Sequence, residues 1–410
     1  MDDTPHGPVL DWIASQADTM RGRVVEWANV NSGTRNLAGL ARQWELVAEV
    51  VRSELDVEPQ RVALGPDTVI DAHGEEQHVA LGDALSAIKR PDAPLRVLCC
   101  IHMDTVYPQD HPFQTVTELG PDRLRGPGVT DAKGGLVVML AALAALERSP
   151  WRERIGWEIL VNPDEEIGSP GSAPLLAAAA KRNHLGLLFE PSLPDGSLVD
   201  RRKGSGNFTV VVRGRSAHAG RDFAKGRSAL LAAADLALKF HALNAQLGGN
   251  VTINIGAIDG GGPVNVVPDL AILRLNVRTG QLNDEERVLF FLHHLVAECD
   301  LKEGISTALH GHFASPPKPL DERSAALLGH IVDCGRELGM TLVSKMSGGV
   351  SDGNKLAAAG LANIDTLGVR GDGIHSPEEY LVVPSLVERT QLAALLLMRL
   401  ASGDIQWEAT

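Results

Sequence analysis

The sequence predicts an α/β fold: a mixed, largely parallel sheet with helices on both faces, plus an inserted α+β module. Uninterrupted apolar runs at 95–101, 155–161 and 185–189 alternate with helical segments, a pattern typical of parallel strands covered on both faces. Residues 204–315 instead indicate the order β-α-β-β-α-β, that of a small sheet with helices on one face. At 410 residues, the chain is also longer than one compact core usually supports.

Helical periodicity accounts for the segments between and after these strands. Residues 37–55 give the clearest signal, because their apolar side chains recur on one helical face. Shorter helices are expected at 134–147 and 174–180, and longer ones at 322–338 and 385–402. A helix between two parallel strands is the usual crossover connection, so this order agrees with the predicted sheet.

The inserted module has its own boundaries. Asn283 is a candidate N-cap for its second helix, and the proline-rich stretch 316–319 ends it, since proline interrupts both helix and sheet. We therefore expect a discontinuous main domain of residues 1–203 and 316–410, interrupted by a module of residues 204–315. The module's strands are expected at 208–212, 251–258, 264–277 and 306–310, and its helices at 228–243 and 283–298.

Composition excludes several classes of partner. With 38 basic and 52 acidic residues, the net charge of -14 argues against nucleic acid or an anionic membrane as a partner. No apolar stretch reaches the ~18 residues that span a membrane, and residues 1–11 lack the apolar core of a signal peptide. The four cysteines show no Cys-x-x-Cys spacing. Reduced thiols in a cytoplasmic protein are therefore expected.

Two adjacent carboxylates, Glu165 and Glu166, follow the apolar run 155–161. Neighbouring side chains that leave a strand point in different directions. One carboxylate can then bind a metal while the other faces a water molecule. Because paired acids in a loop are more often a solvated surface, this interpretation depends on the other motifs.

Four further segments supply residues of the same chemistry. His102 and Asp104 form an His-x-Asp at a strand's carboxyl end, where a carboxylate can orient a metal-binding imidazole. Asp131 lies in a glycine-containing loop that opens a helix, Glu190 ends the run 185–189, and His375 lies in a glycine loop. Each alone has an ordinary explanation, such as an N-cap for Asp131. Together, imidazole and carboxylate donors suit a pair of zinc ions, with cobalt or manganese as substitutes.

In this order of motifs, the chain resembles the di-zinc hydrolase family of glutamate carboxypeptidase, aminoacylase, acetylornithine deacetylase and succinyl-diaminopimelate desuccinylase. The resemblance extends from about residue 20 to 400, and the segment 373–380, Gly-Ile-His-Ser-Pro-Glu-Glu-Tyr, is similar to the carboxypeptidase branch. It implies a catalytic di-zinc domain of residues 1–203 and 316–410, and a lid and dimerisation domain of residues 204–315.

The resemblance also implies a ligand set with two Zn²⁺ per subunit. His102, Asp131 and Glu190 would bind one zinc. Asp131, Glu166 and His375 would bind the other, so that Asp131 bridges the two ions.

Two further roles, and one backbone feature, follow from the resemblance. Asp104 would orient the imidazole of the first ligand, and Glu165 would be the general base. The family also implies a cis peptide between Asp131 and Ala132.

Substrate contacts are implied in the inserted module and in a later loop. His218 matches a family histidine that reaches a neighbouring subunit's active site and contacts the oxyanion, which implies a homodimer through the inserted domain. Asn265 and Arg278 resemble substrate contacts, although a turn residue and a strand-end charge are their ordinary explanations. Gly348 and Gly349 lie in a loop whose backbone N–H groups could hold a carboxylate.

The departure from the family concerns specificity. Glutamate-releasing relatives tend to carry an arginine where this chain has His310 and His312, whose charge varies near neutral pH, so glutamate specificity does not follow. We predict a zinc-dependent, carboxypeptidase-like hydrolase that cleaves a small peptide or an N-acyl amino acid next to a free carboxylate. The alternatives are a small-molecule N-deacylase of the acetylornithine deacetylase or desuccinylase type, and an inactive binding homologue. Retention of Glu165 and of all five ligands argues against inactivity.

Overall fold

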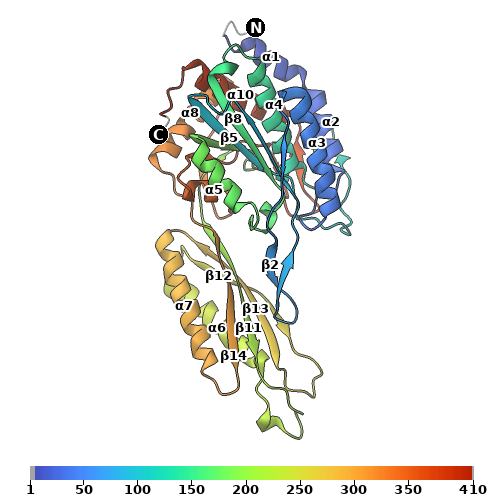
Figure 1. Cartoon of the computed structure of the whole chain (residues 1–410), viewed down its shortest axis with the longest axis vertical. Coiled ribbons are helices and arrows are strands. Elements are labelled where there is room, and N and C mark those ends of the chain that lie inside the picture. The colour runs from blue at the N-terminus through green and yellow to red at the C-terminus, as the bar shows by residue number, and fades with distance from the viewer. Residues whose placement is uncertain (1–4, 409–410) are drawn as a thin grey trace.

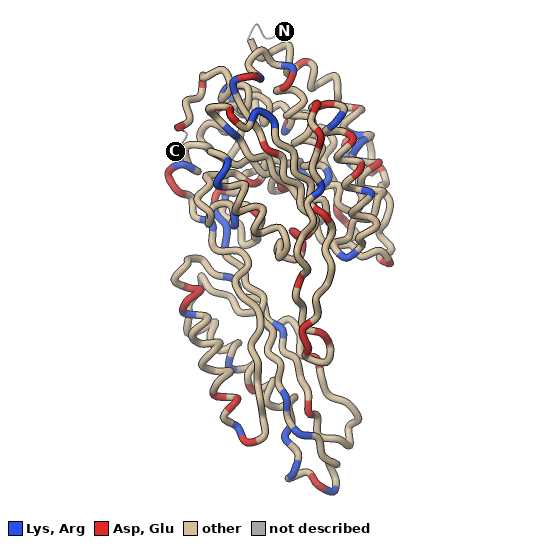
Figure 2. The backbone as a smooth tube through the Cα atoms, viewed as in Figure 1, with Lys and Arg blue, Asp and Glu red and all other residues tan. Residues whose placement is uncertain are grey.

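The computed structural model describes residues 5–408 and has two parts arranged along one long axis (Figure 1). The larger part contains the predicted parallel sheet, and the smaller part is the inserted module. Acidic and basic residues are interspersed along the chain in both parts (Figure 2). Each part has its own hydrophobic cluster, and the cluster of the smaller part lies within residues 208–299.

A six-stranded sheet in the order β1-β4-β8-β5-β9-β16 forms the centre of the larger part. The strands from β8 to β16 are parallel, and β4 and β1 add antiparallel pairs at one edge. Side chains alternate along β5, so Val97, Cys99 and Ile101 enter one hydrophobic cluster while Leu98 and Cys100 enter another. This two-sided burial explains the apolar runs, and the predicted fold class is confirmed. The strands are β1 (Gln60–Val62), β4 (Ala84–Lys89), β5 (Leu95–His102), β8 (Ile155–Asn162), β9 (Leu185–Leu188) and β16 (Asn363–Ile364).

Helices cover both faces of this sheet. On one face, α4 (Gly135–Arg148) packs against α3 (Leu37–Leu55) and α10 (Pro384–Ser402). On the other face, α5 (Ala173–Arg182) packs against α9 (Asp352–Ala358). The remaining helices of this part are α1 (Gly7–Ser15), α2 (Ala17–Ala28) and α8 (Glu322–Glu337).

The helical segment Val129–Arg148, which includes α4, corrects one expectation from the sequence. By length and composition it could cross a membrane, so the expectation that no segment is long and apolar enough was wrong. The whole of its apolar window is buried inside the protein. A helix that is apolar on all sides and enclosed by protein is typical of the core of a large domain.

The inserted module has the predicted β-α-β-β-α-β order. Its four strands form an antiparallel sheet in the order β12-β13-β11-β14, and apolar side chains from both helices join the cluster on one sheet face. Its elements are β11 (Gly204–Arg213), α6 (Ala229–Leu247), β12 (Thr252–Gly260), β13 (Leu270–Thr279), α7 (Leu282–Asp300) and β14 (Ser306–Ser315).

Two boundaries in this module differ from the expectation. The strand expected from residue 264 begins at Leu270, because the preceding residues form a loop that pairs with another loop, with the N–H of Val267 donating to Ala217 O over 2.9 Å. The second helix begins before Asn283. Its N-cap is Gln281, and the Asp284 carboxylate completes a capping box by accepting the backbone N–H of Gln281 at 3.1 Å.

Shorter strands place the loops around the site. The sequence indicated short strands between the helices at 322–338 and 385–402, but gave no bounds for them and did not reveal the others. A hairpin of β2 and β3 extends from the larger part along the inserted module (Figure 1), where the Arg274 guanidinium donates to Ile70 O over 3.2 Å. The acidic tip of this hairpin lies against the module in Figure 2, and Glu75 there pairs with Arg213. These strands are β2 (Asp67–Ile70), β3 (Glu76–Val79), β6 (Thr117–Glu118), β7 (Arg123–Arg125), β10 (Leu198–Arg202), β15 (Ser344–Ser347), β17 (Gly371–Asp372) and β18 (Tyr380–Val382).

Candidate active site

Polar side chains converge where the parallel strands of the central sheet end. His102 is the last residue of β5, and Glu190 follows β9 by two residues. Glu165 and Glu166 follow β8 in a short 3-10 turn. Because parallel strands end at the same edge of a sheet, these side chains come close together. Asp131 joins them from the turn before α4.

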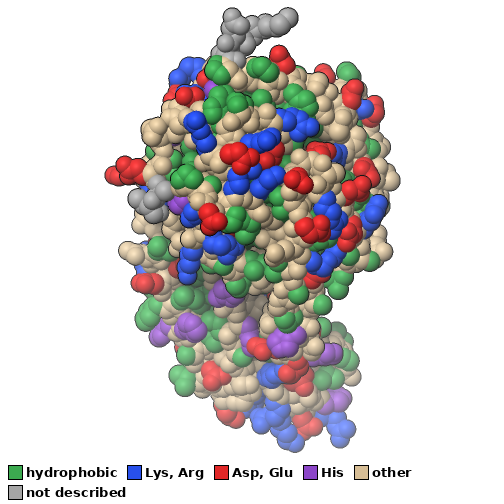
Figure 3. Space-filling model, turned by 45° about the horizontal axis from the view of Figure 1, so that its top comes forward, with side chains coloured by type: hydrophobic (Ala, Val, Ile, Leu, Met, Phe, Trp, Pro, Cys, Tyr) green, Lys and Arg blue, Asp and Glu red, His purple; other side chains and the backbone are tan. Residues whose placement is uncertain are grey.

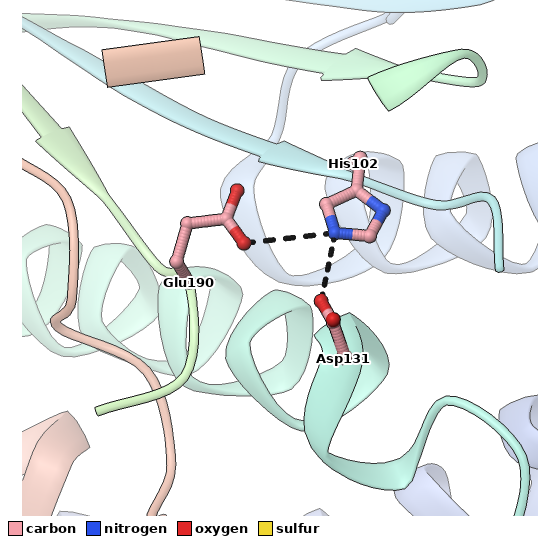
Figure 4. A group of neighbouring side chains, drawn as sticks. All are labelled: His102, Asp131 and Glu190. Atoms are coloured by element: carbon pink, nitrogen blue, oxygen red, sulfur yellow. Dashed lines mark hydrogen bonds and ion pairs between the residues drawn. The ribbon is translucent and has the colours of Figure 1, made fainter. Parts of the chain in front are cut away.

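One group consists of His102, Asp131 and Glu190, whose side chains point toward one another (Figure 4). His102 Nε2 lies 3.1 Å from Asp131 Oδ1 and 3.6 Å from Glu190 Oε2. All three side chains are buried. One imidazole nitrogen therefore faces two carboxylate oxygens, and both carboxylates line a cavity.

A second group shares Asp131 with the first. His375 Nε2 lies 3.2 Å from Asp131 Oδ2 and 3.2 Å from Glu166 Oε2. The two oxygens of one carboxylate thus face two different groups. His375 adopts a positive φ of 62° in the loop between β17 and β18. The peptide between Asp131 and Ala132 is cis, as the resemblance implied.

These residues fit two divalent cations. Four carboxylates, those of Asp131, Glu165, Glu166 and Glu190, line one cavity. Burial raises the pKa of Glu165 well above its ordinary value and the pKa of Glu166 to about 7. Glu166 Oε1 is buried without a hydrogen-bond partner among residues 5–408. Clustered acids with an unsatisfied oxygen need positive charge, and imidazole and carboxylate donors suit zinc.

Asp104 orients both His102 and the turn that carries the two glutamates. Its Oδ1 lies 3.3 Å from His102 Nδ1, which is also 3.0 Å from the Asp104 carbonyl oxygen. Its carboxylate accepts the backbone N–H groups of Glu165 and Glu166, at 3.2 and 3.3 Å. The hydroxyl of Thr34 donates to it over 2.7 Å. One buried carboxylate therefore fixes the imidazole and the glutamate pair together.

Glu165 occupies a position distinct from that of Glu166. It lines the cavity beside the two groups but belongs to neither of them. Its carboxylate is therefore available for proton transfer, while that of Glu166 faces His375.

The cavity around the groups has a volume of about 470 Å³ and is lined by both parts of the molecule. The inserted module contributes Arg278, whose Nε donates to Asn276 Oδ1 over 2.9 Å. Its Nη1 is buried and has no hydrogen-bond partner within the described chain, and burial lowers the pKa of the guanidinium. Asn276 in turn donates to Asn207 Oδ1 over 2.8 Å. A positive charge with a free donor therefore lines the same cavity as the clustered acids.

A family model described as peptidase family M20/M25/M40 matches residues 98–399. The chain belongs to this family. It is 31% identical over 310 residues to carboxypeptidase G2 of Pseudomonas sp. (strain RS-16), which covers 75% of this chain and 74% of that protein. It is 26% identical over 313 residues to succinyl-diaminopimelate desuccinylase of Gluconobacter oxydans (strain 621H), covering 71% and 78%. Its fold is similar to that of the M20 family metallo-carboxypeptidase Sso-CP2 from Sulfolobus solfataricus, with a TM-score of 0.72 at 16% identity over 92% and 98% of the two chains.

Membership of the M20 family establishes the class of chemistry. The protein is a metal-dependent hydrolase of peptide or acyl–amino acid bonds. The resemblance drawn from the order of motifs is confirmed, and so is the assignment as a metallopeptidase or amidohydrolase. The individual residue roles stay predictions.

Two predicted residues of this M20 peptidase lie away from the cavity. His218 and Asn265 lie in two loops of the inserted module that pair with each other, where the N–H of Ala219 donates to Asn265 O over 2.9 Å. Neither lines the cavity. In the anion-loop candidate, Gly349 lines the cavity but Gly348 does not.

His310 and His312, the two histidines of β14, also lie outside the cavity. His310 Nδ1 lies 3.3 Å from Glu76 Oε1 of the β2–β3 hairpin, and His312 is exposed. Histidines gather on the face shown in Figure 3, mostly on the lower half of the molecule.

Glu379 is a site residue that sequence reasoning missed. Its carboxylate accepts the backbone N–H groups of Gly128, Thr130 and Asp131 at 3.0, 2.9 and 3.0 Å. The hydroxyl of Tyr107 donates to it over 2.8 Å, and burial raises the pKa of the carboxyl to about 6. It therefore holds the loop that presents the shared aspartate, but nothing local in the sequence distinguishes it from Glu378.

Arg202 is a second missed residue of the cavity wall. Its guanidinium donates twice to Asp365, over 2.8 and 3.0 Å, and Lys318 Nζ donates to the same carboxylate over 2.7 Å. All three side chains are buried. This buried cluster fixes the chain where the inserted module leaves and rejoins the larger part.

Proposed function

We propose that this M20 peptidase holds two zinc ions and cleaves an amide bond next to a free carboxylate, as a carboxypeptidase does. The observation that carries the proposal is the guanidinium of Arg278, which is partly buried with an unsatisfied donor in the cavity that contains both candidate metal groups. A guanidinium binds carboxylates through charge-assisted hydrogen bonds, and its planar donors match their geometry. A substrate held there by its free carboxylate would present its amide to the metal groups.

The proposed chemistry assigns each residue of the cluster one task. His102, Asp131 and Glu190 would hold one ion, and Glu166 and His375 would hold the other together with Asp131. When bound, such a pair supplies a Lewis acid and lowers the pKa of water. Asp104 keeps the imidazole in place for its ion.

Glu165 is the proposed general base. It would accept a proton from the attacking water and then deliver that proton to the leaving nitrogen. Burial raises the pKa of its carboxyl well above the ordinary value, which suits a group that takes up and releases this proton. Cobalt or manganese could replace zinc at the same donors.

A homodimer is part of the proposal. β12 is an edge strand of the module's sheet, and α6 beside it exposes Leu231 and Leu238, which lie on one helical face. A second copy paired at this edge would cover these side chains. We propose that His218 and Asn265 of a second copy then reach the cavity, where His218 would stabilise the oxyanion.

A deacylase that releases a small acyl group is the second candidate. Similarity to a succinyl-diaminopimelate desuccinylase over 71% of the chain favours it, and Arg278 would serve such a substrate equally. For location, we propose the cytoplasm, which the four free and buried cysteines support.

The test is a hydrolysis screen with added zinc or cobalt. Dipeptides and N-acetyl, N-succinyl and N-benzyloxycarbonyl amino acids are each assayed with a free carboxylate and as the matching carboxamide. We expect kcat/KM to fall at least ~100-fold for the carboxamides, because a buried charged donor loses its partner. Arg278→Ala should remove most of this preference. Equal hydrolysis of acid and carboxamide by the native enzyme would contradict the proposal, and the best acyl group decides between peptidase and deacylase.

A further inference from the structure

A second cavity of about 400 Å³ lies next to the candidate active site. Its walls come from two segments, 33–36 before α3 and 105–109 after β5, together with Glu166 and Ile167. This volume lies within the usual range for sites that bind small molecules. Nothing in the proposed chemistry uses this space.

The two cavities meet at the candidate metal groups. Glu166 and Ile167 line both of them, and Glu166 belongs to the group with His375. Arg278 lines only the first cavity. A substrate whose amide lies at the metal groups therefore has two directions in which its halves can extend. One half can reach the guanidinium, and the other can enter the second cavity.

The walls of the second cavity are held by main-chain hydrogen bonds. The N–H of Thr105 donates to Ser32 O over 3.1 Å, and the N–H of Thr34 donates to Thr105 O over 3.3 Å. A bridge between Gly33 and Thr105 joins the two wall segments. The cavity is therefore formed without a ligand, which favours binding because little order must be gained.

The chemistry of these walls is mainly apolar. Val106, Pro108 and Ile167 contribute aliphatic surface, and Arg35 is the one cation among the lining residues. Arg35 already forms an ion pair with Asp67, so its charge is largely balanced. The Glu166 carboxylate in this cavity faces His375 of the candidate metal group, so the remaining wall fits a group with an apolar body.

We infer that the second cavity binds the acyl half of the substrate, and that this half is an extended, mainly apolar group, such as an apolar aminoacyl residue or a longer acyl chain. The inference rests on the proposed function, in which Arg278 holds the carboxylate half. Because the acyl half must leave the metal groups in the other direction, it meets Val106 and Ile167. An acetyl group would leave most of this space empty, and an apolar group that fills it gains binding energy.

The test varies the acyl group while the released amino acid stays constant. N-acetyl, N-hexanoyl and N-benzyloxycarbonyl forms of one amino acid are compared, with Val106→Trp to fill the second cavity. We expect kcat/KM of the native enzyme to rise with acyl length, and the variant to lose at least ~10-fold on the two longer groups but less than about 3-fold on acetyl. Leu193→Trp is the matched control, since Leu193 lines only the first cavity at similar burial. It should lower the rates of all three substrates alike.

A second variant keeps the test valid if Val106→Trp does not fold. Gln109 is exposed at the edge of the second cavity, and the four native cysteines are buried, so Gln109→Cys offers one accessible thiol. The unlabelled protein serves as its own folded control. Labelling with N-phenylmaleimide should lower hydrolysis of the hexanoyl and benzyloxycarbonyl substrates and spare the acetyl substrate.

Other outcomes contradict the inference. Equal losses for all acyl groups, no loss after labelling, or an acyl-length effect produced only by Leu193→Trp would place the acyl half elsewhere. If the native enzyme hydrolyses these substrates but prefers acetyl, the inference is wrong while the proposed function stands. If it hydrolyses dipeptides but none of these three, the inference is again wrong while the proposed function stands. If it hydrolyses no substrate of either screen, the proposed function fails, and the inference with it.

Discussion

At the scale of the residue, one carboxylate organises the site. Asp131 directs its two oxygens to His102 and His375, over 3.1 and 3.2 Å, and so joins two groups that come from distant parts of the chain. Adjacent residues Glu165 and Glu166 are divided between two positions, because only Glu166 lies against a histidine of these groups. The separate tasks of the two glutamates follow from this geometry, which a buried network of backbone donors maintains.

A substitution of Glu379 tests the hydrogen bonds that hold the loop of Asp131. Glu379→Gln replaces one of the two accepting oxygens by an NH₂, which then faces either the N–H of Gly128 or the N–H groups of Thr130 and Asp131. We expect the free energy of unfolding to fall by about 1–3 kcal/mol, since a buried donor loses its acceptor. Urea unfolding measures this change. Glu378→Gln is the control, because Glu378 is exposed, and an equal effect of both variants would contradict the role assigned to Glu379.

At the scale of the element, strand ends and short sheets position the chemistry. The carboxyl ends of β5, β8 and β9 supply the inner residues, and the small sheet of β17, β18, β7 and β6 fixes the loop of His375. The buried cluster of Arg202, Lys318 and Asp365 joins β10 to the segment after β14 and to the segment after β16. This cluster lies where the chain passes from the larger part into the module and where it returns.

The Asp365 cluster gives a pH-dependent prediction. Its two cationic partners hold the pKa of Asp365 well below its ordinary value. Its contribution to stability is therefore complete above the unfolded pKa of about 4 and is lost as pH falls toward the folded pKa. Asp365→Asn should cost about 3–5 kcal/mol at pH 7, and the difference from the native protein should shrink below about pH 4.

Urea unfolding at pH 7 and at progressively lower pH measures both parts of that prediction. Asp195→Asn is the control, because the Asp195–Lys345 pair is about half exposed and should contribute little. A difference for Asp365→Asn that stays constant down to pH 3 would show that the charge of Asp365 does not provide the stability.

Sequence patterns predicted the long elements better than the short ones. Strands such as β8, buried along their whole length, leave an apolar run, and α3 leaves a helical repeat. Strands of two or three residues, such as β6 and β17, are too short to produce a recognisable alternation of apolar and polar residues in the sequence. The loop before β13 misled the prediction because its exposed Val264 and Val266 continue a strand-like sequence.

The same limit applies to the site. Five motifs in order along the chain indicated which residues the structure brings into two groups, although their roles as ligands stay predictions. Glu379 and the Asp365 cluster left no such signal. Arg202 and Asp365 are 163 positions apart, and only the fold shows that their charges meet.

At the scale of the whole molecule, the cavity belongs to both parts of the chain. Arg278 enters it from the inserted module, while the acidic groups come from the larger part. The β2–β3 hairpin adds a second connection between the parts, through Arg274 and through His310 with Glu76. Any change in the angle between the parts therefore changes the distance from the guanidinium to the metal groups.

The proposed dimer is tested at this scale. Leu231→Glu combined with Leu238→Glu should convert a dimer to a monomer in analytical ultracentrifugation, because two charges replace the proposed apolar contact. The turnover of this double variant should fall in parallel. The turnover of His218→Ala should also fall, and elemental analysis should find the metal content of both variants unchanged. Leu301→Glu, on α7's far end and 87% exposed, should leave the dimer intact. A native protein that is monomeric and fully active would contradict this part of the proposal.

The central claim is that Glu165 moves the proton while its neighbour and four other residues hold the metal ions. Glu165→Gln keeps the size of the side chain and removes its basicity. We predict that this variant binds two metal ions per chain by elemental analysis and loses at least ~100-fold in kcat on the best substrate. Near-native kcat with two metal ions bound would contradict the claim.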